Sequence, residues 1–278
     1  MTEQKAPPQL RLRVFAGPNG SGKSTVIKMI RDTIVDDDRT KLDVGSYINA
    51  DDIAKALTNN IFSFADYEIS CGNDDVLKFA EASGLLFDNF SLEKLSSAFD
   101  INNNKLELLD KQSLDRVAQI IARYLRKALL TAEKRFSFET VFSHESNLDI
   151  MREAVQAGYK VYLYFVSTES PEINKFRVAL RVKEGGHDVP ADRIEKRYYR
   201  SLELLYEAAE IAYQAFFFDN SIDFEPFKLV GHFKKSGDKK IWDTVDNGKV
   251  SAWFRKYYLS VAAHKGDDVP EVYKANGA

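Results

Sequence analysis

Gly17-Pro-Asn-Gly-Ser-Gly-Lys-Ser24 is the stretch of sequence that decides the fold. It matches the pattern G-x-x-x-x-G-K-[ST], in which the glycines let successive backbone N–H groups point at phosphate oxygens. Residues 10–16 before it (Leu-Arg-Leu-Arg-Val-Phe-Ala) alternate between apolar and charged side chains and then become continuously apolar. This pattern is typical of a β-strand. Residues 23–35 after it have a helical pattern, so the positive end of a helix dipole faces the same place. The motif predicts a phosphate-binding loop between a strand and a helix.

Two side chains of this loop predict its ligand. Lys23 is expected to neutralise the β- and γ-phosphates of ATP, and Ser24 is expected to bind Mg²⁺. The loop does not by itself distinguish a kinase from an enzyme that hydrolyses nucleoside triphosphates. A motor or switch ATPase usually adds a long apolar strand that ends in an acid pair, and residues 136–139 are the nearest substitute. The complete cofactor-binding prediction is Gly17, Pro18, Asn19, Gly20, Ser21, Gly22, Lys23, Ser24 and Thr25.

Composition and charge exclude several classes of protein. Of 278 residues, 44% are hydrophobic and 29% are charged, which is ordinary for a folded globular chain. The net charge of −3 provides no broad positive field for nucleic acid or anionic lipid. The one cysteine, Cys71, excludes an internal disulfide. Residues 1–8 lack the apolar core of a signal peptide, and no apolar run approaches the ~20 residues of a membrane span. We expect a soluble cytoplasmic protein.

Strand-like and helix-like segments alternate along the chain. This alternation predicts an α/β fold of the P-loop kinase type, a mostly parallel sheet with helices on both faces. In such sheets ligands bind at the carboxyl ends of the strands. The expected strands are residues 10–16, 46–50, 136–139, 160–166 and 215–218, and the main expected helices are 23–35, 53–57, 113–134, 148–157, 172–183 and 191–213.

The domain prediction places the kinase domain at residues 1–225. Residues 59–112 are more polar than their surroundings and are expected to form a helical insertion. Residues 172–200 are expected to form a basic lid. The remainder, residues 226–278, is expected to be a small extension packed on the core, with a hairpin over 227–233 and 239–245 and a final helix over 253–263.

Two acids are candidates for the acceptor side of the site. Asp51 follows the second expected strand, where a carboxylate can orient or deprotonate an attacking hydroxyl, so it is our candidate catalytic base. The alternative for Asp51 and Asp52 is that they cap the following helix. Glu139 ends an apolar run and would be costly to bury without a partner. It is a candidate to hold the acceptor or the magnesium shell, or else it is a structurally paired acid.

The lid prediction rests on the spacing of arginines. Arginines three or four residues apart project from one face of a helix, and phosphoryl transfer gains from arginines that meet charge on the transferred group. Gly185 and Gly186 between the two helices would let the segment move. The alternative is a solvated basic face paired with neighbouring acids. Arg181 is the first candidate, and the others are Arg177, His187, Arg193, Arg197 and Arg200.

Taken together, these residues resemble the zeta-toxin family, and more closely the zeta-toxin-like predicted kinases of Gram-negative bacteria. The resemblance covers about residues 10–222. It implies a P-loop kinase that phosphorylates a sugar hydroxyl of UDP-N-acetylglucosamine, and any antitoxin would be a separate chain. The motifs that carry it are residues 17–25, Ile48-Asn-Ala-Asp-Asp52, Phe138-Glu-Thr140, Arg181 with Gly185-Gly-His-Asp-Val-Pro190, Arg197-Tyr-Tyr-Arg-Ser-Leu202 and Asp219-Asn-Ser221.

The resemblance also implies roles for individual residues. By position, Lys23 and Ser24 bind ATP and magnesium, Asp51 is the catalytic base, Glu139 contacts the acceptor and Arg181 contacts the phosphates. The sequence departs from the family at one point. A second family arginine, just before the proline of the lid, is replaced here by His187.

The function that the sequence predicts is an ATP- and Mg²⁺-dependent phosphotransferase with an alcohol group of a small molecule as acceptor. Two alternatives remain open. One is an ATPase switch whose nucleotide state controls the binding of a protein partner. The other is a polynucleotide end kinase, in which the aromatic stretch 253–258 would stack bases. The charge balance disfavours a nucleic-acid track, and no membrane partner is expected.

Overall fold

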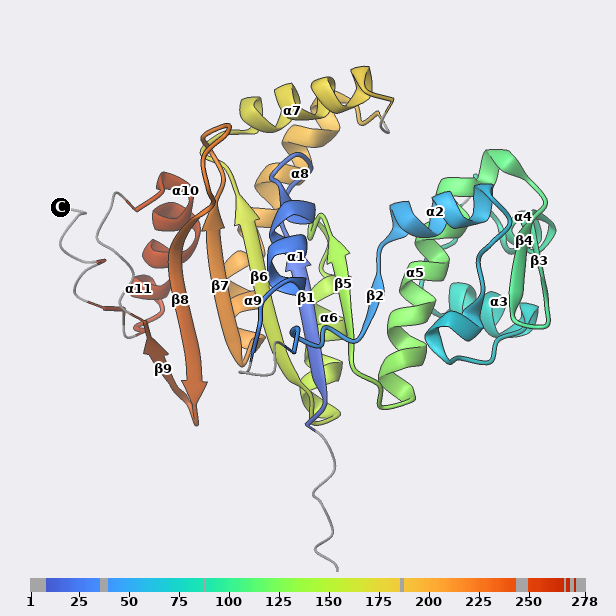
Figure 1. Ribbon diagram of the computed structural model, residues 1–278, viewed down its shortest axis with the longest axis horizontal. Helices are drawn as coiled ribbons and strands as arrows, with labels where there is room; N and C mark the ends of the chain where they lie inside the picture. Colours follow the sequence, from blue (N-terminus) through green and yellow to red (C-terminus); the bar gives the residue numbers. More distant parts are fainter. Residues whose placement is uncertain are drawn as a thin grey trace, which may run out of the picture. The chain divides into compact units, whose positions relative to one another are not determined.

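The structure is a computed structural model that describes residues 9–35, 40–87, 89–185, 188–243, 250–267, 269–270 and 273 (Figure 1). The chain divides into two compact units, residues 44–139 and the remainder, 1–43 with 140–278. We call them the inserted unit and the main unit. The predicted division at residues 225 and 226 stays a prediction. His187, and the predicted end of the hairpin at Val245, lie outside the described residues.

The main unit contains a sheet whose central strands are parallel. β1 pairs with β6 from Arg11 and Lys160 to Ala16 and Phe165, and β6 pairs with β7 in the same direction. These strands are almost continuously apolar because helices cover both faces of the sheet, as Figure 1 shows. The strands are β1 (Arg11–Ala16), β6 (Lys160–Ser167), β7 (Gln214–Asp219), and the antiparallel β8 (Lys228–Ser236) and β9 (Lys239–Trp242).

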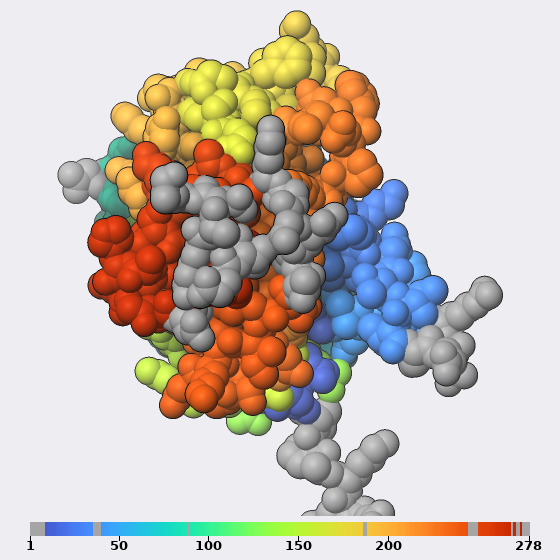
Figure 2. Space-filling view, turned by 90° about the vertical axis from the view of Figure 1, so that its left-hand side faces the viewer, coloured from blue at the N-terminus to red at the C-terminus, as the bar shows by residue number. Residues whose placement is uncertain are grey.

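The helices of the main unit lie on either side of this sheet. α1 packs on β1 and β6, and α6 and α9 pack against β6 from the opposite face (Figure 1). Figure 2 shows the β8–β9 hairpin in orange beside the C-terminal helical segment in red. The helices are α1 (Lys23–Arg31), α6 (Ser146–Gln156), α7 (Pro171–Lys183), α8 (Ala191–Glu203), α9 (Leu205–Ile211), α10 (Ala252–Phe254), a π-helical turn (Arg255–Leu259) and α11 (Ser260–His264).

The inserted unit is built around the long helix α5 (Leu114–Thr131). α5 buries Val117, Ile121 and Leu125 from one stripe and packs against α2 and α3. β2 (Ser46–Ile48) pairs in parallel with β5 (Phe136–Thr140). The remaining elements are α2 (Ala50–Thr58), α3 (Asn73–Ala82), α4 (Leu92–Ala98), two 3₁₀ turns (Phe64–Tyr67 and Lys111–Ser113), and the strands β3 (Phe99–Asn102) and β4 (Lys105–Leu108).

The predicted α/β class with mostly parallel strands is confirmed, with two differences in detail. The segment 59–112, predicted as a helical insertion, contains an antiparallel hairpin of β3 and β4 in addition to its helices. The expected helix 191–213 is interrupted at Leu204, where α8 ends and α9 begins. In the part of the chain that the structure describes, no helix is both long enough and apolar enough to cross a membrane.

Candidate active site

The predicted phosphate-binding loop lies between the end of β1 and the start of α1, as its sequence indicates. Gly17, Gly20 and Gly22 have φ of 143°, 72° and 92°, a region that side chains rarely adopt. A Cβ on Gly20 would lie 2.7 Å from the carbonyl oxygen of Asn174. On Gly17 it would overlap the carbonyl of Val166, and on Gly22 the amide of Asn220. The loop therefore requires glycine at all three positions.

Polar groups of the loop are arranged for an anionic ligand. Lys23 is 7% exposed, and its Nζ donates to the carbonyl oxygen of Pro18 at 2.9 Å, so the ammonium group is held over the loop. The Ser21 Oγ and the Asn19 Oδ1 are buried and accept or donate no hydrogen bond within the described residues. Buried oxygens of this kind are usually satisfied by a ligand or by water. Ser24 is exposed in the first turn of α1, where a hydroxyl can reach a phosphate-bound Mg²⁺.

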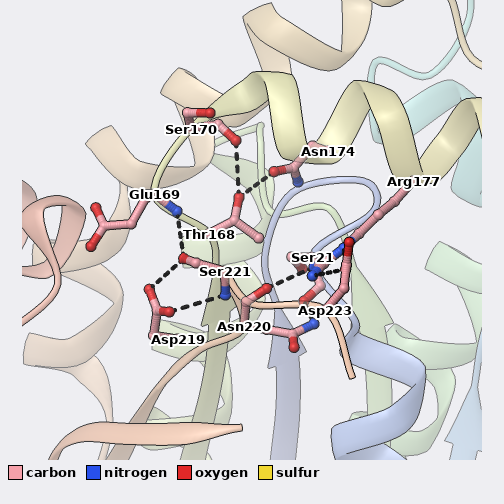
Figure 3. Close-up of polar contacts among 10 residues, drawn as sticks. All are labelled: Ser21, Thr168, Glu169, Ser170, Asn174, Arg177, Asp219, Asn220, Ser221 and Asp223. Carbon is pink, nitrogen blue, oxygen red and sulfur yellow. Dashed lines mark hydrogen bonds and ion pairs between the residues drawn. The ribbon is translucent and has the colours of Figure 1, made fainter. Parts of the chain in front are cut away.

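Two asparagines from distant parts of the chain hold the loop in place (Figure 3). Asn220, just after β7, donates from Nδ2 to the carbonyl oxygen of Ser21 at 2.8 Å. Asn174, on α7, donates to the carbonyl oxygen of Asn19 and accepts a hydrogen bond from the hydroxyl of Thr168. These two bonds hold the carbonyl groups of Asn19 and Ser21 in place from outside the loop. The sequence analysis assigned neither residue a role, although Asn220 lies in the motif Asp219-Asn-Ser221.

Asp219, at the end of β7, has a structural role. It is 9% exposed, and its Oδ2 accepts from the Trp253 indole N–H at 2.7 Å and from the Ser221 hydroxyl at 3.0 Å. Ser221 in turn accepts from the backbone N–H of Glu169 at 2.9 Å (Figure 3). The Glu169 carboxylate accepts from the N–H of Ala252, the first residue of α10. This chain of bonds fastens the C-terminal helices to the sheet edge beside the loop.

Among the lid candidates, Arg177 is firmly held by protein groups. Its Nε and Nη2 donate to Asp223 at 2.9 and 2.6 Å, and its Nη1 donates to the Asn220 carbonyl oxygen at 2.7 Å. Arg181 lies one turn later on α7 and is exposed. Arg177 thus links α7 to the same segment that supports the loop.

The other lid candidates lie on α8. Arg193 and Arg200 are exposed and Arg197 is half-buried; burial, together with the nearby charge of Arg193, lowers the pKa of Arg197. α7 and α8 pack together through Val178, Val189 and Ile194. The lid itself stays a prediction.

The inserted unit contains a polar cluster around Glu139. The Glu139 Oε2 accepts from the Tyr47 hydroxyl at 2.9 Å and from the Asn49 Nδ2 at 3.1 Å. Burial and the charge of Glu139 raise the pKa of Tyr47, which keeps the phenol protonated and donating. Asn49 also caps α2, because its Oδ1 accepts from the Asp51 N–H at 2.8 Å. The cap is therefore Asn49, and the carboxylate of Asp51 is exposed in the first turn of α2.

Arg126 lies beneath this cluster. It is half-buried, with its Nε fully enclosed, and its guanidinium carbon is 4.0 Å from the centroid of the Phe138 ring, a cation–π contact. Its Nη2 is 3.4 Å from the Glu139 carbonyl oxygen. Burial, followed by the charge of Arg123, lowers the pKa of Arg126 to about 9. The sequence prediction did not select Arg126, because it sits within the apolar periodicity of a helix.

The structure thus collects the predicted residues into two sets. The phosphate-binding loop belongs to the main unit, with Arg177 beside it through Asn220. Asp51 and Glu139 belong to the inserted unit and are joined through Asn49. The roles assigned to these residues remain predictions.

No model of a protein family matches the chain. An uncharacterised protein of Haemophilus influenzae is 35% identical over 63 residues, which are 23% of this chain and 45% of that protein. The chain thus spans less than half the length of this curated relative.

Solved structures of similar overall fold include that of the PezAT chromosomal toxin–antitoxin system of Streptococcus pneumoniae, at 13% identity and a TM-score of 0.46, covering 99% of this chain and 85% of that one. Another is the AvrRxo1-ORF1:AvrRxo1-ORF2 complex with sulphate ions, at 14% identity and a TM-score of 0.49, covering 96% and 75%. The same complex has been solved with ATP, at 14% identity and a TM-score of 0.47 with the same coverage. The function has to be argued from the residues of this chain.

Proposed function

We propose that the chain is an ATP- and Mg²⁺-dependent phosphotransferase that phosphorylates a hydroxyl group of a small molecule, with a nucleotide sugar such as UDP-N-acetylglucosamine as the leading acceptor. The observation that carries the proposal is the loop at residues 17–24. It combines three glycines at positive φ where a Cβ would clash, a buried lysine held over the loop and a buried serine hydroxyl that has no hydrogen-bond partner among the described residues. This is a cradle for a polyphosphate.

In this proposal each part of the loop has one task. The backbone N–H groups bind the phosphate oxygens, and Lys23 neutralises the β- and γ-phosphates. Ser24 and Thr25 stand at the start of α1, where Ser24 would hold Mg²⁺. When bound, ATP supplies the phosphoryl group and Mg²⁺ offsets its charge. Arg181, on the outward part of α7, is proposed to meet the transferred group.

The acceptor side is proposed to be the cluster of the inserted unit. Asp51 would accept the proton of the attacking hydroxyl, and its carboxylate is available because Asn49 caps α2. Glu139 would receive a hydroxyl of the acceptor, with Tyr47 and Asn49 fixing the orientation of its carboxylate. The identification of the acceptor as a nucleotide sugar rests on the resemblance in sequence to zeta toxins. An antitoxin, if one acts on this chain, is proposed to be a separate protein.

The test is incubation of the purified chain and Mg²⁺ with γ-labelled ATP against nucleotide sugars, nucleosides and oligonucleotides. We expect label transfer to a nucleotide sugar. Asp51→Asn should reduce transfer by about 10²–10⁴-fold while ATP binding is kept, since a general base contributes that much. The matched control is Asp52→Asn, at the neighbouring exposed position. Hydrolysis of ATP that no acceptor changes would favour a switch ATPase instead, and transfer to oligonucleotide ends would favour a polynucleotide kinase.

A further inference from the structure

A cavity lies in the main unit at the opposite end of the sheet from the phosphate-binding loop. It has a volume of about 540 Å³, which is within the range of small-molecule sites. Its lining comes from the end of α6, the beginning of β6, the end of α9 and the end of β8. The loop follows β1, which runs parallel to β6, so the two sites lie beyond opposite strand ends. β6 has eight residues, which at ~3.3 Å each separates the sites by about 25 Å.

The lining of this cavity is positively charged. It contains Arg152, Lys160 and Lys235 against a single carboxylate, Glu210. Glu210 is already neutralised, because its Oε1 forms an ion pair with Lys240. Arg152 is partly neutralised by Asp149 at 2.9 Å and by Glu207.

The two lysines face the cavity without a direct carboxylate partner. Among the described residues, no carboxylate lies within ion-pair distance of Lys160 or Lys235, although Glu210, Asp267 and Asp238 contribute negative charge near Lys235. Lys160 Nζ lies 4.5 Å from the centroid of the Tyr213 ring, and Lys235 donates to the backbone carbonyl of Glu210. Burial, with a smaller effect of the Lys240 charge, lowers the pKa of Lys235, and the nearby carboxylates of Glu210, Asp267 and Asp238 oppose this shift.

The remainder of the lining is apolar or aromatic. Val155 and Ile211 supply aliphatic surface, and Tyr213 supplies an aromatic ring. The Tyr213 ring packs edge-to-face with Tyr162 at a centroid distance of 5.7 Å. A simple inorganic ion would leave this surface in contact with water. A ligand that has both a negative group and an apolar body would use the whole cavity.

We propose that this cavity is a second ligand site, for a small organic anion in which a phosphate or carboxylate is carried on an aromatic or aliphatic body. The anionic group lies between Lys160 and Lys235, and the body packs against Ile211 and Tyr213. The site does not depend on the proposed phosphotransferase activity, because it shares no residue with the loop or with the acceptor cluster.

Phenyl phosphate is the probe that tests the site, and its binding to the full chain can be measured by calorimetry and by saturation-transfer NMR. We expect saturable binding that Lys160→Gln with Lys235→Gln weakens at least about tenfold. Lys239→Gln, an exposed lysine outside the cavity, and Lys23→Ala, in the loop, should leave the binding unchanged.

A second variant protects the test against misfolding of the double variant. Gln156→Glu, at an exposed position of the lining, adds a negative charge without removing a contact and should also weaken binding. Absence of saturable binding up to about 10 mM would overturn the proposal, since that is weaker than a built site provides. Binding that disappears with Lys23→Ala but survives in both cavity variants would overturn it too, because the probe would then occupy the loop.

Discussion

Gly22→Ala is the substitution that examines the architecture of the phosphate-binding loop most closely. A Cβ at this position would overlap the Nδ2 of Asn220 and lie 3.3 Å from the Phe227 ring. The obstacle is therefore the side chain that supports the loop through its hydrogen bond to the Ser21 carbonyl at 2.8 Å. Gly22→Ala should displace Asn220 and break that bond.

The cost can be worked out from two contributions. Alanine at φ 92° carries a left-handed backbone penalty of about 1–2 kcal/mol. Loss of the Asn220 hydrogen bond costs about 1 kcal/mol. We expect Gly22→Ala to lower the free energy of unfolding by about 2–3 kcal/mol, and Asn220→Ala to lower it by about 1 kcal/mol. Because both variants lose the same bond, the double variant should be about 1 kcal/mol more stable than the sum of the two predicts.

The assay is urea denaturation of the wild type, both single variants and the double variant, with Mg·ATP affinity measured by calorimetry on the same samples. Asn174→Ala combined with Gly22→Ala serves as the comparison, since Asn174 supports a different carbonyl of the loop. Strict additivity of Gly22→Ala and Asn220→Ala, within about 0.3 kcal/mol, would refute the reasoning. It would mean that the two residues do not share the contact that the structure shows.

Three other outcomes are expected. Tyr47→Phe removes the hydroxyl that donates to Glu139. In steady-state kinetics kcat should therefore fall about tenfold while the KM for ATP is unchanged. A change in the KM for ATP alone would contradict this. Arg177→Met breaks the contacts to Asp223 and should lower the melting temperature more than Lys183→Met, at an exposed position of the same helix. Equal effects in scanning fluorimetry would argue against the anchoring role. Burial raises the pKa of the Cys71 thiol to about 11. Iodoacetamide at pH 8 should therefore alkylate the folded chain about a hundredfold more slowly than the unfolded chain. Similar rates would contradict the burial of this thiol.

The phosphate-binding loop was predictable because its information is local. The glycines, Lys23 and Ser24 lie within eight consecutive residues, and each type has a direct physical reason. Asn174 and Asn220 were not predictable, because they are 155 and 199 residues away from the residues whose carbonyls they bind. Nothing in the local sequence of an isolated asparagine distinguishes a support of this kind from a surface residue.

The hairpin in the inserted unit was missed although a signal was present. Asn103 and Asn104 have φ of 50° and 63°, which is the left-handed pair that a two-residue hairpin turn needs. Asparagine tolerates this conformation, so two of them between short amphipathic stretches indicate a turn between strands. The prediction of a helical insertion over residues 59–112 does not use this signal. The cluster of Tyr47, Asn49 and Glu139 was half predicted, since the acid was found and its two partners were not.

The binding of Mg·ATP to Lys23→Ala, measured by calorimetry beside the wild type, tests the central claim most directly. The matched control is Lys28→Ala, an exposed lysine on the same helix. We expect saturable binding to the wild type and to Lys28→Ala. We expect affinity to fall at least about tenfold in Lys23→Ala, since a charge-assisted contact to phosphate contributes about 1.5–3 kcal/mol. Equal affinity for all three chains, or no binding to the wild type, would contradict it.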